Sequence, residues 1–532
     1  MTNKIYKLSI ALLPWVLFFV LAIFLLRNSF SYSDSDLGWH LRVGAEIAAS
    51  GQAPTIDHYN YTLSGQGWVD HEWLLNYGLA LIFSQTSFWG LHLFFLFIIA
   101  VTIFFVWRRI FNFSLFSKSD PALSIGIFAC LALGLFASRP HLGLRVQEIG
   151  LMFLSILFFL FSHFSRYRPW FLSLPLIFML WANLHGSFLL GLSLLFAYCL
   201  YACLAGFIKN WPIFRKFAIS AFSKKDCLFL VLIFIFSLLA TLVNPYGLGL
   251  YSFLGSYANT LYMTYIHEWQ SQFILPLYYP QLYYLALAAA FFLYLWGFGK
   301  RLSFSLWDWA LAILFFIMAF RSRRHFPIFV IASLPLMSAV VQEFINNFSW
   351  PFKKIWLLRL GVAGLLIVGG YALWLGFSLP WRQDGIRDFC GKKYPCAAVS
   401  YLQSRPETSS WRLFNEYNWG GFLLFAYPEK ELFIDGRMPQ APYRGRTILE
   451  EYLAFRSPDS DFNFLLSDYD IRLVLIKQIR PPLSLRESEK LFFQVTEQEL
   501  TVDNPLYSYL SQSPDWRVVF SDNLSIIYER VQ

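Results

Sequence analysis

The sequence predicts an α-helical polytopic membrane protein of about eleven transmembrane helices, N-terminus inside, with a C-terminal extracytoplasmic α/β domain. Composition is the first of two observations behind this prediction. Of 532 residues, 57% are hydrophobic, 20% aromatic and only 14% charged, and the mean hydropathy is +0.49. Soluble globular proteins are about 45–50% apolar and about 25% charged. The apolar excess excludes a disordered chain, and six cysteines in 532 residues exclude a secreted disulfide scaffold.

The second observation is a series of apolar runs, each near the roughly 17–25 residues that a bilayer requires. With the N-terminus inside, every predicted inner segment is basic, for example at Arg108 and Arg109, as the positive-inside rule expects. We therefore expect a multi-pass protein of the plasma (inner) membrane. The first run is read as a retained anchor because no small-x-small cleavage site follows it. The runs lie at about 8–26, 87–107, 122–138, 148–164, 170–184, 188–208, 227–243, 282–298, 304–320, 326–342 and 355–379.

Charge divides the chain near Leu379 into a transmembrane domain, 1–379, and an extracytoplasmic α/β domain, 380–532. The first part holds 24 of the 42 Lys and Arg and 12 of the 33 Asp and Glu, a net charge of +12, whereas the remainder carries −3. Topology explains this excess better than nucleic-acid binding, so we expect no nucleic-acid partner. In the outer domain, alternating apolar residues predict strands at 432–434, 473–476, 517–520 and 526–528, and helices at 448–455 and 506–510.

The long first outer loop, about residues 31–86, holds the first candidate site. Asp34 and Asp36 form a D-x-D pair that can hold a divalent metal, Mg or Mn, or supply a general base. The alternative is that one of them N-caps the next helix. Residues 39–47 predict an amphipathic helix along the membrane surface. Residues 70–73, Asp-His-Glu-Trp, are expected to begin a second helix. They are either part of a functional site or a helix cap followed by an acidic residue in the first turn.

Reactive side chains crowd the outer face, where seven of the nine histidines fall, while the predicted span interiors are almost bare of charge. A transporter would more often bury ionisable groups within its spans. The arginines at 321, 323 and 324 violate the positive-inside trend, and guanidinium groups suit phosphate oxygens. The alternative for this cluster is contact with anionic headgroups or with the acidic outer domain. The seven outer histidines are His40, His58, His71, His141, His185, His267 and His325.

These features together resemble the GT-C glycosyltransferases, polytopic enzymes that use polyprenyl-phosphate-linked sugars, and in particular a group of bacterial GT-C-like proteins. The first outer loop has Asp-His-Glu-Trp at 70–73 where protein mannosyltransferases carry a His-Pro-Pro-type element. The acceptor therefore does not follow from the resemblance. The motifs that carry it are D-x-x-W-H at Asp36–His40, W-x-D-H-E-W-L at Trp68–Leu74, R-P-H at Arg139–His141, N-L-H-G at Asn183–Gly186, N-P-Y-G at Asn244–Gly247 and F-x-D-G-R at Phe433–Arg437.

The resemblance implies a glycosyltransferase that moves a sugar from a polyprenyl-phosphate-linked donor to an extracytoplasmic acceptor, which is a glycan, a lipid or a protein. A carboxylate would deprotonate the acceptor, giving inversion, and cationic groups would stabilise the departing phosphate. The alternatives are an inactive scaffold subunit of envelope polysaccharide assembly and a lipid or polysaccharide transporter. Asp36 is the first candidate base, with Asp34 or Glu72 behind it; the candidate substrate- and phosphate-binding residues are Arg321, Arg324, Arg139, His141, His40, His71, Asn183, His185 and Glu268.

Three features of the outer domain complete the expectations. Cys390 and Cys396 are expected to form a disulfide in an oxidising compartment, with a pair of free thiols as the alternative. Asp435 and Arg437 end a strand and either reach the membrane site or an acceptor, or form an internal ion pair. The Trp-Gly-Gly sequence at 419–421 predicts no chemistry.

Overall fold

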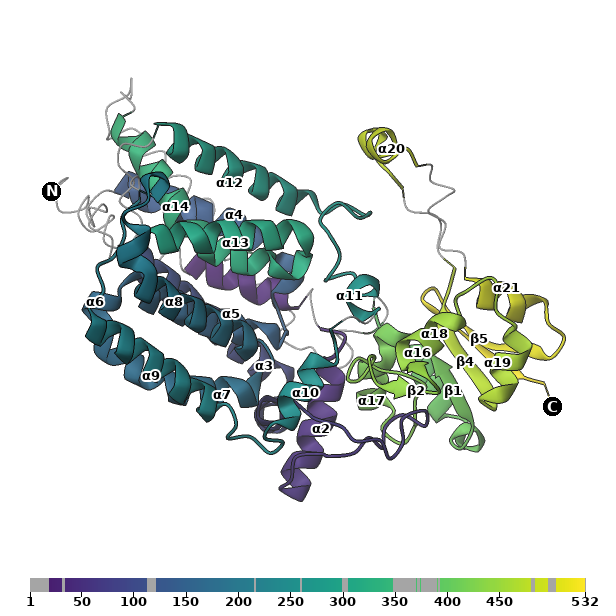
Figure 1. Cartoon of the computed structure of the whole chain (residues 1–532). Helices are drawn as coiled ribbons and strands as arrows, with labels where there is room; N and C mark the ends of the chain where they lie inside the picture. Colours follow the sequence, from purple (N-terminus) through teal and green to yellow (C-terminus); the bar gives the residue numbers. More distant parts are fainter. Residues whose placement is uncertain are drawn as a thin grey trace. The chain divides into compact units, whose positions relative to one another are not determined.

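The chain folds into two compact units in the computed structural model (Figure 1), and three separate stretches of sequence contribute to each. Unit 1 comprises Met1–Ser33, Trp89–Leu248 and His267–Arg382, and unit 2 comprises Asp34–Phe88, Gly249–Ile266 and Gln383–Gln532. The domain division expected near residue 379 stays a prediction. The structure describes residues 19–30, 34–111, 121–214, 217–258, 261–298, 305–347, 370, 374, 390, 393–479, 484–495 and 504–531.

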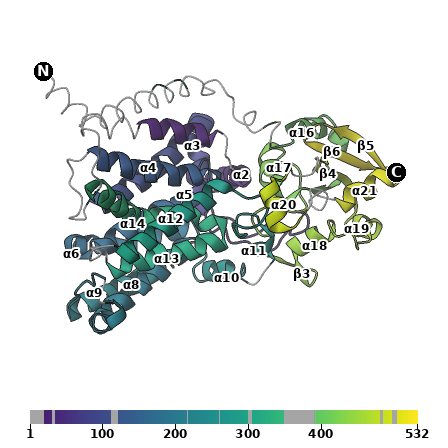
Figure 2. The ribbon, with the colours of Figure 1, turned by 90° about the horizontal axis from the view of Figure 1, so that it is seen from above.

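Unit 1 is helical, and its helices lie on the apolar runs. Helix α8, for example, spans Phe188–Ile208, which matches the run predicted at 188–208. Helix α14 packs against α4, α12 and α13, and these four lie together in Figures 1 and 2. The other bounds are 19–29, α3 Trp73–Phe111, α4 Pro121–Ala137, η1 Arg139–His141, α5 Gln147–Ser162, α6 Phe164–Tyr167, η2 Arg168–Ser173, α7 Leu174–Leu184, η3 Pro212–Phe214, α9 Lys224–Ala240, α12 Tyr279–Phe298, α13 Leu306–Arg321, η4 Arg323–His325 and α14 Phe326–Asn347.

Within the described residues, three helices are long and apolar enough to cross a membrane: Trp73–Ile110, Phe188–Ile208 and Arg323–Phe344. A fourth crossing is available if Gln147–Ser162 and Phe164–Leu184, bent by 101°, count as one span. The predicted span at 355–379 lies outside the described residues except for 370 and 374, and the first span is described only from residue 19. The number of eleven spans therefore stays a prediction.

Two structural features mark the long helix α3. Its backbone leaves helical geometry at Ser87, where φ is 56° and ψ is −155°, next to the boundary between the units at residues 88 and 89. Near its C-terminal end, the Arg109 guanidinium forms a 2.6 Å ion pair with Asp308 of α13, and both side chains are 1% exposed. Ser162 of α5 donates a second hydrogen bond to the same carboxylate. This buried pair joins three helices of unit 1.

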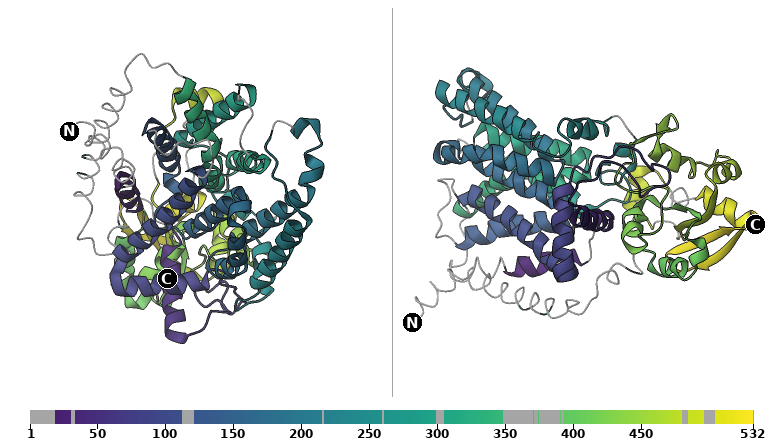
Figure 3. Two further views of the ribbon diagram at one scale, coloured as in Figure 1. Left: turned by 90° about the vertical axis from the view of Figure 1, so that its left-hand side faces the viewer. Right: turned by 90° about the horizontal axis from the view of Figure 1, so that it is seen from below.

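Unit 2 contains a four-stranded sheet in the order β1-β4-β6-β5, in which β1 and β4 are parallel and the other pairs antiparallel. The strands are β1 Arg412–Asn415, β4 Ile471–Lys477, β5 Trp516–Ser521 and β6 Ser525–Arg530. A two-residue ladder joins β2 Pro442–Tyr443 to β3 Arg446–Thr447. Figure 3 shows the sheet in the yellow and green C-terminal part of the chain. The helices are α2 Leu37–Ser50, α10 Gly249–Gly255, α11 Tyr262–Tyr265, α16 Cys396–Gln403, η6 Pro406–Thr408, η7 Tyr417–Trp419, α17 Gly420–Ala426, α18 Ile448–Ala454, α19 Phe462–Asp468, α20 Glu487–Phe493 and α21 Pro505–Gln512.

Most of the expected outer-domain elements are present, but the strand predicted at 432–434 is not a strand of the sheet. Leu432 forms only an isolated parallel bridge with Asn60. The next backbone groups bond to a side chain instead: Asn415 accepts from the Phe433 N–H at 2.9 Å and donates to the Ile434 carbonyl at 2.9 Å. The amide side chain satisfies these groups and ends the strand pairing. The segment is extended because it pairs with Asn60 of the first loop and bonds to the Asn415 side chain.

The helix predicted from residues 39–47 is α2, but its apolar face is covered by protein. Trp39, Val43 and Ile47 belong to the same buried core as the sheet residues, and α2 packs against α17. The expectation that this face lies on a membrane surface is therefore wrong: the side chains that would enter lipid are already buried within unit 2.

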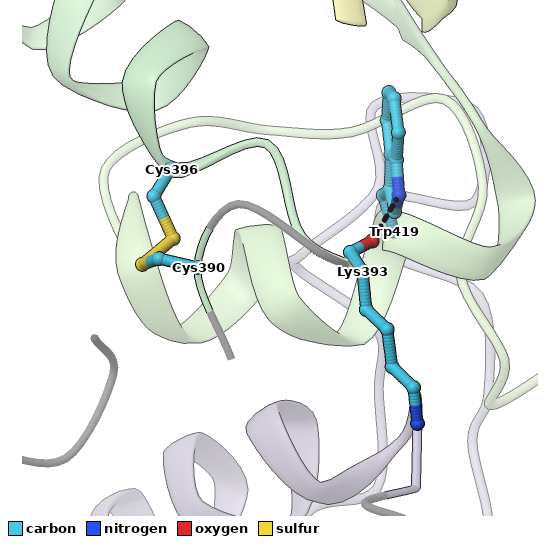
Figure 4. Close-up of a disulfide and its surroundings, with 4 residues drawn as sticks. All are labelled: Cys390, Lys393, Cys396 and Trp419. Atoms are coloured by element: carbon cyan, nitrogen blue, oxygen red, sulfur yellow. Dashed lines mark hydrogen bonds between the residues drawn. A yellow bond between two sulfur atoms is a disulfide. The ribbon is translucent and has the colours of Figure 1, made fainter. Parts of the chain in front are cut away.

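The outer-domain cysteines expected to pair are bonded to each other. Cys390 and Cys396 form a disulfide with a Cα–Cα distance of 5.3 Å (Figure 4). Within the loop that it closes, the Lys393 carbonyl accepts a 3.0 Å hydrogen bond from the indole N–H of Trp419. The disulfide thus holds the loop that supports the start of α17.

Candidate active site

Asp36 lies directly before α2, but its side chain is not used as a cap. It occupies the N-cap position with φ −88° and ψ −13°, and its carboxylate accepts no capping hydrogen bond. The carboxylate lies against the backbone of Gly436, where a Cβ atom, if the residue had one, would stand 2.3 Å from Oδ1. Asp34 accepts a 3.2 Å hydrogen bond from the Asp36 backbone N–H. The fold therefore directs the first candidate base toward the Phe433–Arg437 motif.

That motif forms a buried triad of charges. Arg437 donates to Asp435 at 2.6 Å and makes an ion pair with Asp57 at 2.7 Å, and none of the three side chains is more than 1% exposed. The guanidinium also lies over the rings of Tyr59 and Trp68, 4.2 and 4.6 Å from their centroids. The internal ion pair expected as one alternative for Asp435 and Arg437 is therefore present. Their reach to a membrane site or an acceptor stays a prediction. Asp57 is a partner that the sequence did not reveal.

Two tyrosines lie beside the carboxylates: Tyr257, which is half-buried, and Tyr417, which is buried. The pKa of Tyr257 is raised well above its usual value, first by burial and then by neighbouring groups that include Tyr262, Glu72 and Asp36. Its hydroxyl donates to the Arg437 carbonyl at 3.0 Å. Burial likewise raises the pKa of Tyr417, with Asp36 again among the contributing charges. Asp36 and Glu72 thus belong to one electrostatic neighbourhood within unit 2.

A buried chain of hydrogen bonds orients the side chains around Glu72. Asn76 donates to both oxygens of Asp70, at 2.9 and 2.8 Å, so its own oxygen must accept the 2.6 Å bond from His40 Nδ1. His40 Nε2 then faces Glu72 at 3.8 Å, and His71 Nε2 lies 3.5 Å from the other Glu72 oxygen. Burial lowers the pKa of His40 to about 3, although the hydrogen bond to Asn76 acts to raise it. Burial raises the pKa of Asp70 to about 6, although the hydrogen bonds from Asn76 act to lower it. His40 and His71 therefore contact a candidate base, and Asn76 sets the tautomer of His40.

Loops of unit 1 that the sequence predicts to be on the outer side form a second polar cluster, centred on Glu268. Its carboxylate pairs with Arg145 and lies 3.9 Å from Arg324. The pKa of Glu268 is lowered to about 2 although burial acts to raise it, because the Arg145 and Arg324 guanidinium groups supply positive charge. The Arg324 guanidinium also lies over Trp269 at 4.9 Å. Glu268 therefore contacts guanidinium groups, and Arg145 is a cation that no sequence pattern singled out.

The three arginines expected to act together have different surroundings. Arg323 is 4% exposed and donates to the Ile274 and Pro276 carbonyls and contacts His267 Nε2 at 2.6 Å, so it holds the loop. Arg321 ends α13 with an exposed side chain, and Arg324 lies in the Glu268 cluster. This division could not be read from a run of similar residues.

The remaining candidates in unit 1 are engaged in local structure. The Asn183 amide donates to the Met179 and Val243 carbonyls at 2.8 and 2.9 Å. His185 Nδ1 pairs with the Ser187 hydroxyl at 2.7 Å. The Arg139 guanidinium lies 4.2 Å above the Phe136 ring. These contacts shape the loops and do not by themselves indicate a ligand.

Metal binding at Asp34 and Asp36 stays a prediction. Among the residues that the structure describes, there is no group of three or more His, Cys, Asp or Glu side chains placed to hold a metal ion. The geometry instead shows carboxylates paired with cations or set beside tyrosines.

The chain is similar in fold to solved glycosyltransferases. It aligns with the Archaeoglobus fulgidus oligosaccharyltransferase tethered to an acceptor peptide containing the NVT sequon, with TM-score 0.54 and 13% identity over 99% of this chain and 74% of that one. The apo form of that enzyme gives TM-score 0.51 and 12% identity over 90% and 70%. The alignment with ArnT from Cupriavidus metallidurans bound to undecaprenyl phosphate has TM-score 0.48 and 13% identity, and it covers 97% of this chain and 98% of that one. No protein-family model and no curated protein matches the sequence. The resemblance to the GT-C glycosyltransferases is confirmed at the level of the fold.

Proposed function

We propose that this protein is a membrane glycosyltransferase that transfers a sugar from a polyprenyl-phosphate-linked donor to an extracytoplasmic acceptor, with Asp36 as the general base. The observation that carries the proposal is the placement of the Asp36 carboxylate, which lies against Gly436 and within the electrostatic neighbourhood of Glu72 and Tyr257. A carboxylate that served as a helix cap would accept from the first-turn N–H groups. Asp36 stands at a helix N-cap without making that bond.

In the proposed reaction, Asp36 removes the proton of an acceptor hydroxyl or amine as the acceptor attacks the anomeric carbon. The bond from that carbon to the lipid phosphate breaks, which inverts the configuration and releases a polyprenyl phosphate. Glu72, which lies 3.8 Å from His40 Nε2 and 3.5 Å from His71 Nε2, is the second carboxylate proposed to act on the acceptor. General-base assistance of this kind typically contributes about 10²–10⁴-fold to the rate.

For the donor phosphate we propose arginines of unit 1 that the sequence predicts to lie on the outer side. Arg324 and Arg145 share Glu268, and Arg321 is exposed at the end of α13. Guanidinium groups stabilise the charge that develops on a departing phosphate. Arg323 has no such role in the proposal, because its Nη2 donates to two backbone carbonyls and its Nη1 contacts His267.

The proposed orientation places the C-terminal domain outside the plasma membrane. It rests on the excess of Lys and Arg in the predicted inner segments and on the odd number of predicted spans. A phosphatase fusion after Phe455 should be active and a galactosidase fusion at the same position inactive; the opposite result would overturn the orientation.

The test of the function is Asp36→Asn, with Glu46→Gln as the matched control. Both changes neutralise one carboxylate of the same segment, but Glu46 pairs with Arg42 and Tyr59. The assay measures release of polyprenyl phosphate from synthetic undecaprenyl-phosphate hexoses. We expect Asp36→Asn to lower the rate by about 10²–10⁴-fold with normal folding, because Asn keeps the size of the side chain and Asp36 makes no capping hydrogen bond that the change would remove. Full activity of this variant would remove Asp36 from catalysis, and a wild-type protein that binds the donor without turnover would favour the scaffold alternative.

A further inference from the structure

Two glycine-containing motifs of the C-terminal domain meet the segment that carries Asp36. Gly420 and Gly421 begin α17, and Gly436 follows Asp435 in the Phe433–Arg437 motif. The first pair has no chemistry of its own, and Gly436 cannot donate or accept through a side chain. What the three share is a lack of room for a Cβ atom.

The space around each glycine is already filled by a different backbone or side chain. A Cβ on Gly436 would stand 2.3 Å from Asp36 Oδ1, 2.9 Å from Cγ and 3.1 Å from Oδ2. A Cβ on Gly421 would stand 2.4 Å from the Ser35 carbonyl oxygen and 3.1 Å from the Asp36 Cα atom. On Gly420 it would meet the Cα and Cβ atoms of Asp435, both at 2.6 Å.

Backbone conformation does not require glycine at these positions. Gly420, Gly421 and Gly436 are not among the glycines of positive φ, so an alanine would suit their dihedral angles. Close approach is the remaining reason for glycine. The two motifs therefore need glycine for their contacts with Asp36 and with each other.

The loop that carries Gly436 is held rigidly. Arg437, the next residue, is 2% exposed and pairs with Asp57 of the first outer loop and with Asp435. Gly420 packs on the Asp435 backbone, and Gly421 packs on the segment of Ser35 and Asp36. These contacts join the C-terminal domain to the first outer loop within unit 2 on both sides of the Asp36 carboxylate.

We propose that Gly436 and Gly421 are positioning residues that seat the Asp36 carboxylate for proton transfer, an inference that rests on the proposed function. Gly436 limits the carboxylate from one side, while Gly421 limits the backbone that carries it. A methyl group at 436 would have to move the carboxylate oxygen by about 1 Å to reach an ordinary contact distance, and a misplacement of about 1 Å can cost about 10²-fold in rate.

The kinetic test is a double-mutant cycle between Gly436→Ala and Asp36→Asn. We expect Gly436→Ala to lower kcat by about 10²-fold with little change in the KM for undecaprenyl-phosphate hexose. In the Asp36→Asn background the same substitution should have no further effect, because the residue acts only through the carboxylate. Gly67→Ala is the matched control, since nothing lies within 4 Å of a Cβ there, and it should behave as wild type. Gly421→Ala provides an independent second variant with the same expected pattern.

Two results would overturn the inference. Wild-type kinetics in Gly436→Ala would show that the contact between Gly436 and the Asp36 carboxylate is not needed for catalysis. An equal loss of kcat in the wild-type and Asp36→Asn backgrounds would show that Gly436 has a purely structural role. A cross-link supplies a readout independent of activity: in an Asp36→Cys, Gly436→Cys variant, oxidation should join the two sulfurs, whereas Asp36→Cys with Gly67→Cys should not cross-link. Absence of the first cross-link would refute the contact itself. A formed cross-link with an inactive wild-type protein would refute the proposed function and leave the contact intact.

Discussion

Replacing Arg437 by methionine should destabilise unit 2 by about 3–5 kcal/mol, because it leaves buried carboxylates without their counter-charge. The guanidinium is 2.7 Å from Asp57 and 2.6 Å from Asp435, and all three side chains are at most 1% exposed. The rings of Tyr59 and Trp68 cover the guanidinium. Water therefore cannot replace the lost interactions, as it does at a surface ion pair.

The same arrangement predicts how the stability lost in Arg437→Met depends on pH and on the two carboxylates, Asp57 and Asp435. Burial already raises the pKa of Asp57, and Arg437 acts in the opposite direction. Without Arg437 this pKa rises further above its value in the unfolded chain, so the variant should regain stability as the pH falls and the carboxyl takes up a proton. The triple variant Arg437→Met, Asp57→Asn, Asp435→Asn buries no charge at this position and should be more stable than Arg437→Met alone.

The assay is urea unfolding of the full chain in detergent, followed by tryptophan fluorescence at pH 5 and pH 8. Arg444→Met is the control, because its ion pair with Asp468 is 47% and 34% exposed and a surface pair is worth about 0–1 kcal/mol. Equal unfolding midpoints for Arg437→Met and Arg444→Met would refute the reasoning. A triple variant less stable than the single variant would refute it as well.

Three further predictions concern other parts of the chain. Burial raises the pKa of Asp70 to about 6, so its contribution to stability should fall by up to about 3 kcal/mol as the pH rises from about 4 to about 6; Asp70→Asn should flatten this part of a thermal-unfolding profile, and an unchanged profile would contradict the burial argument. Arg324→Ala should weaken binding of undecaprenyl phosphate by roughly tenfold or more, and unchanged affinity would favour contact with headgroups. Cys390 and Cys396 should resist alkylation until they are reduced, after which the outer domain should lose about 2 kcal/mol of stability; alkylation of both without reduction would exclude the bond.

Much of the local structure was predictable from the chain alone. The run at 188–208 is helix α8, and the strand expected at 473–476 lies inside β4. Hydropathy and side-chain periodicity determine such elements because an apolar run must be buried whatever its neighbours are. The strand expected at 432–434 was wrong because the backbone groups of this segment bond to residues that its own sequence does not reveal. Leu432 bonds to the backbone of Tyr59 and Tyr61, and the Phe433 N–H donates to the Asn415 side chain.

The candidate site could be predicted residue by residue but not as an arrangement. Asp36 and Glu72 were identified from their types and positions, whereas Asp57, Asn76 and Arg145 had no local signal that distinguished them from ordinary polar residues. The sequence of residues 321–325 likewise does not reveal that Arg323 donates to backbone carbonyls while the Arg321 side chain is exposed.

The role of the C-terminal motifs depended entirely on the tertiary structure. Glycine at 420, 421 and 436 has no side chain from which chemistry can be read, and its meaning lies in what approaches it: Asp435, the Ser35 carbonyl and the Asp36 carboxylate. Such contacts join residues far apart in the chain, and they form only when the whole of unit 2 packs. Composition and spacing describe what each segment is, but only packing decides which backbone a carboxylate rests on.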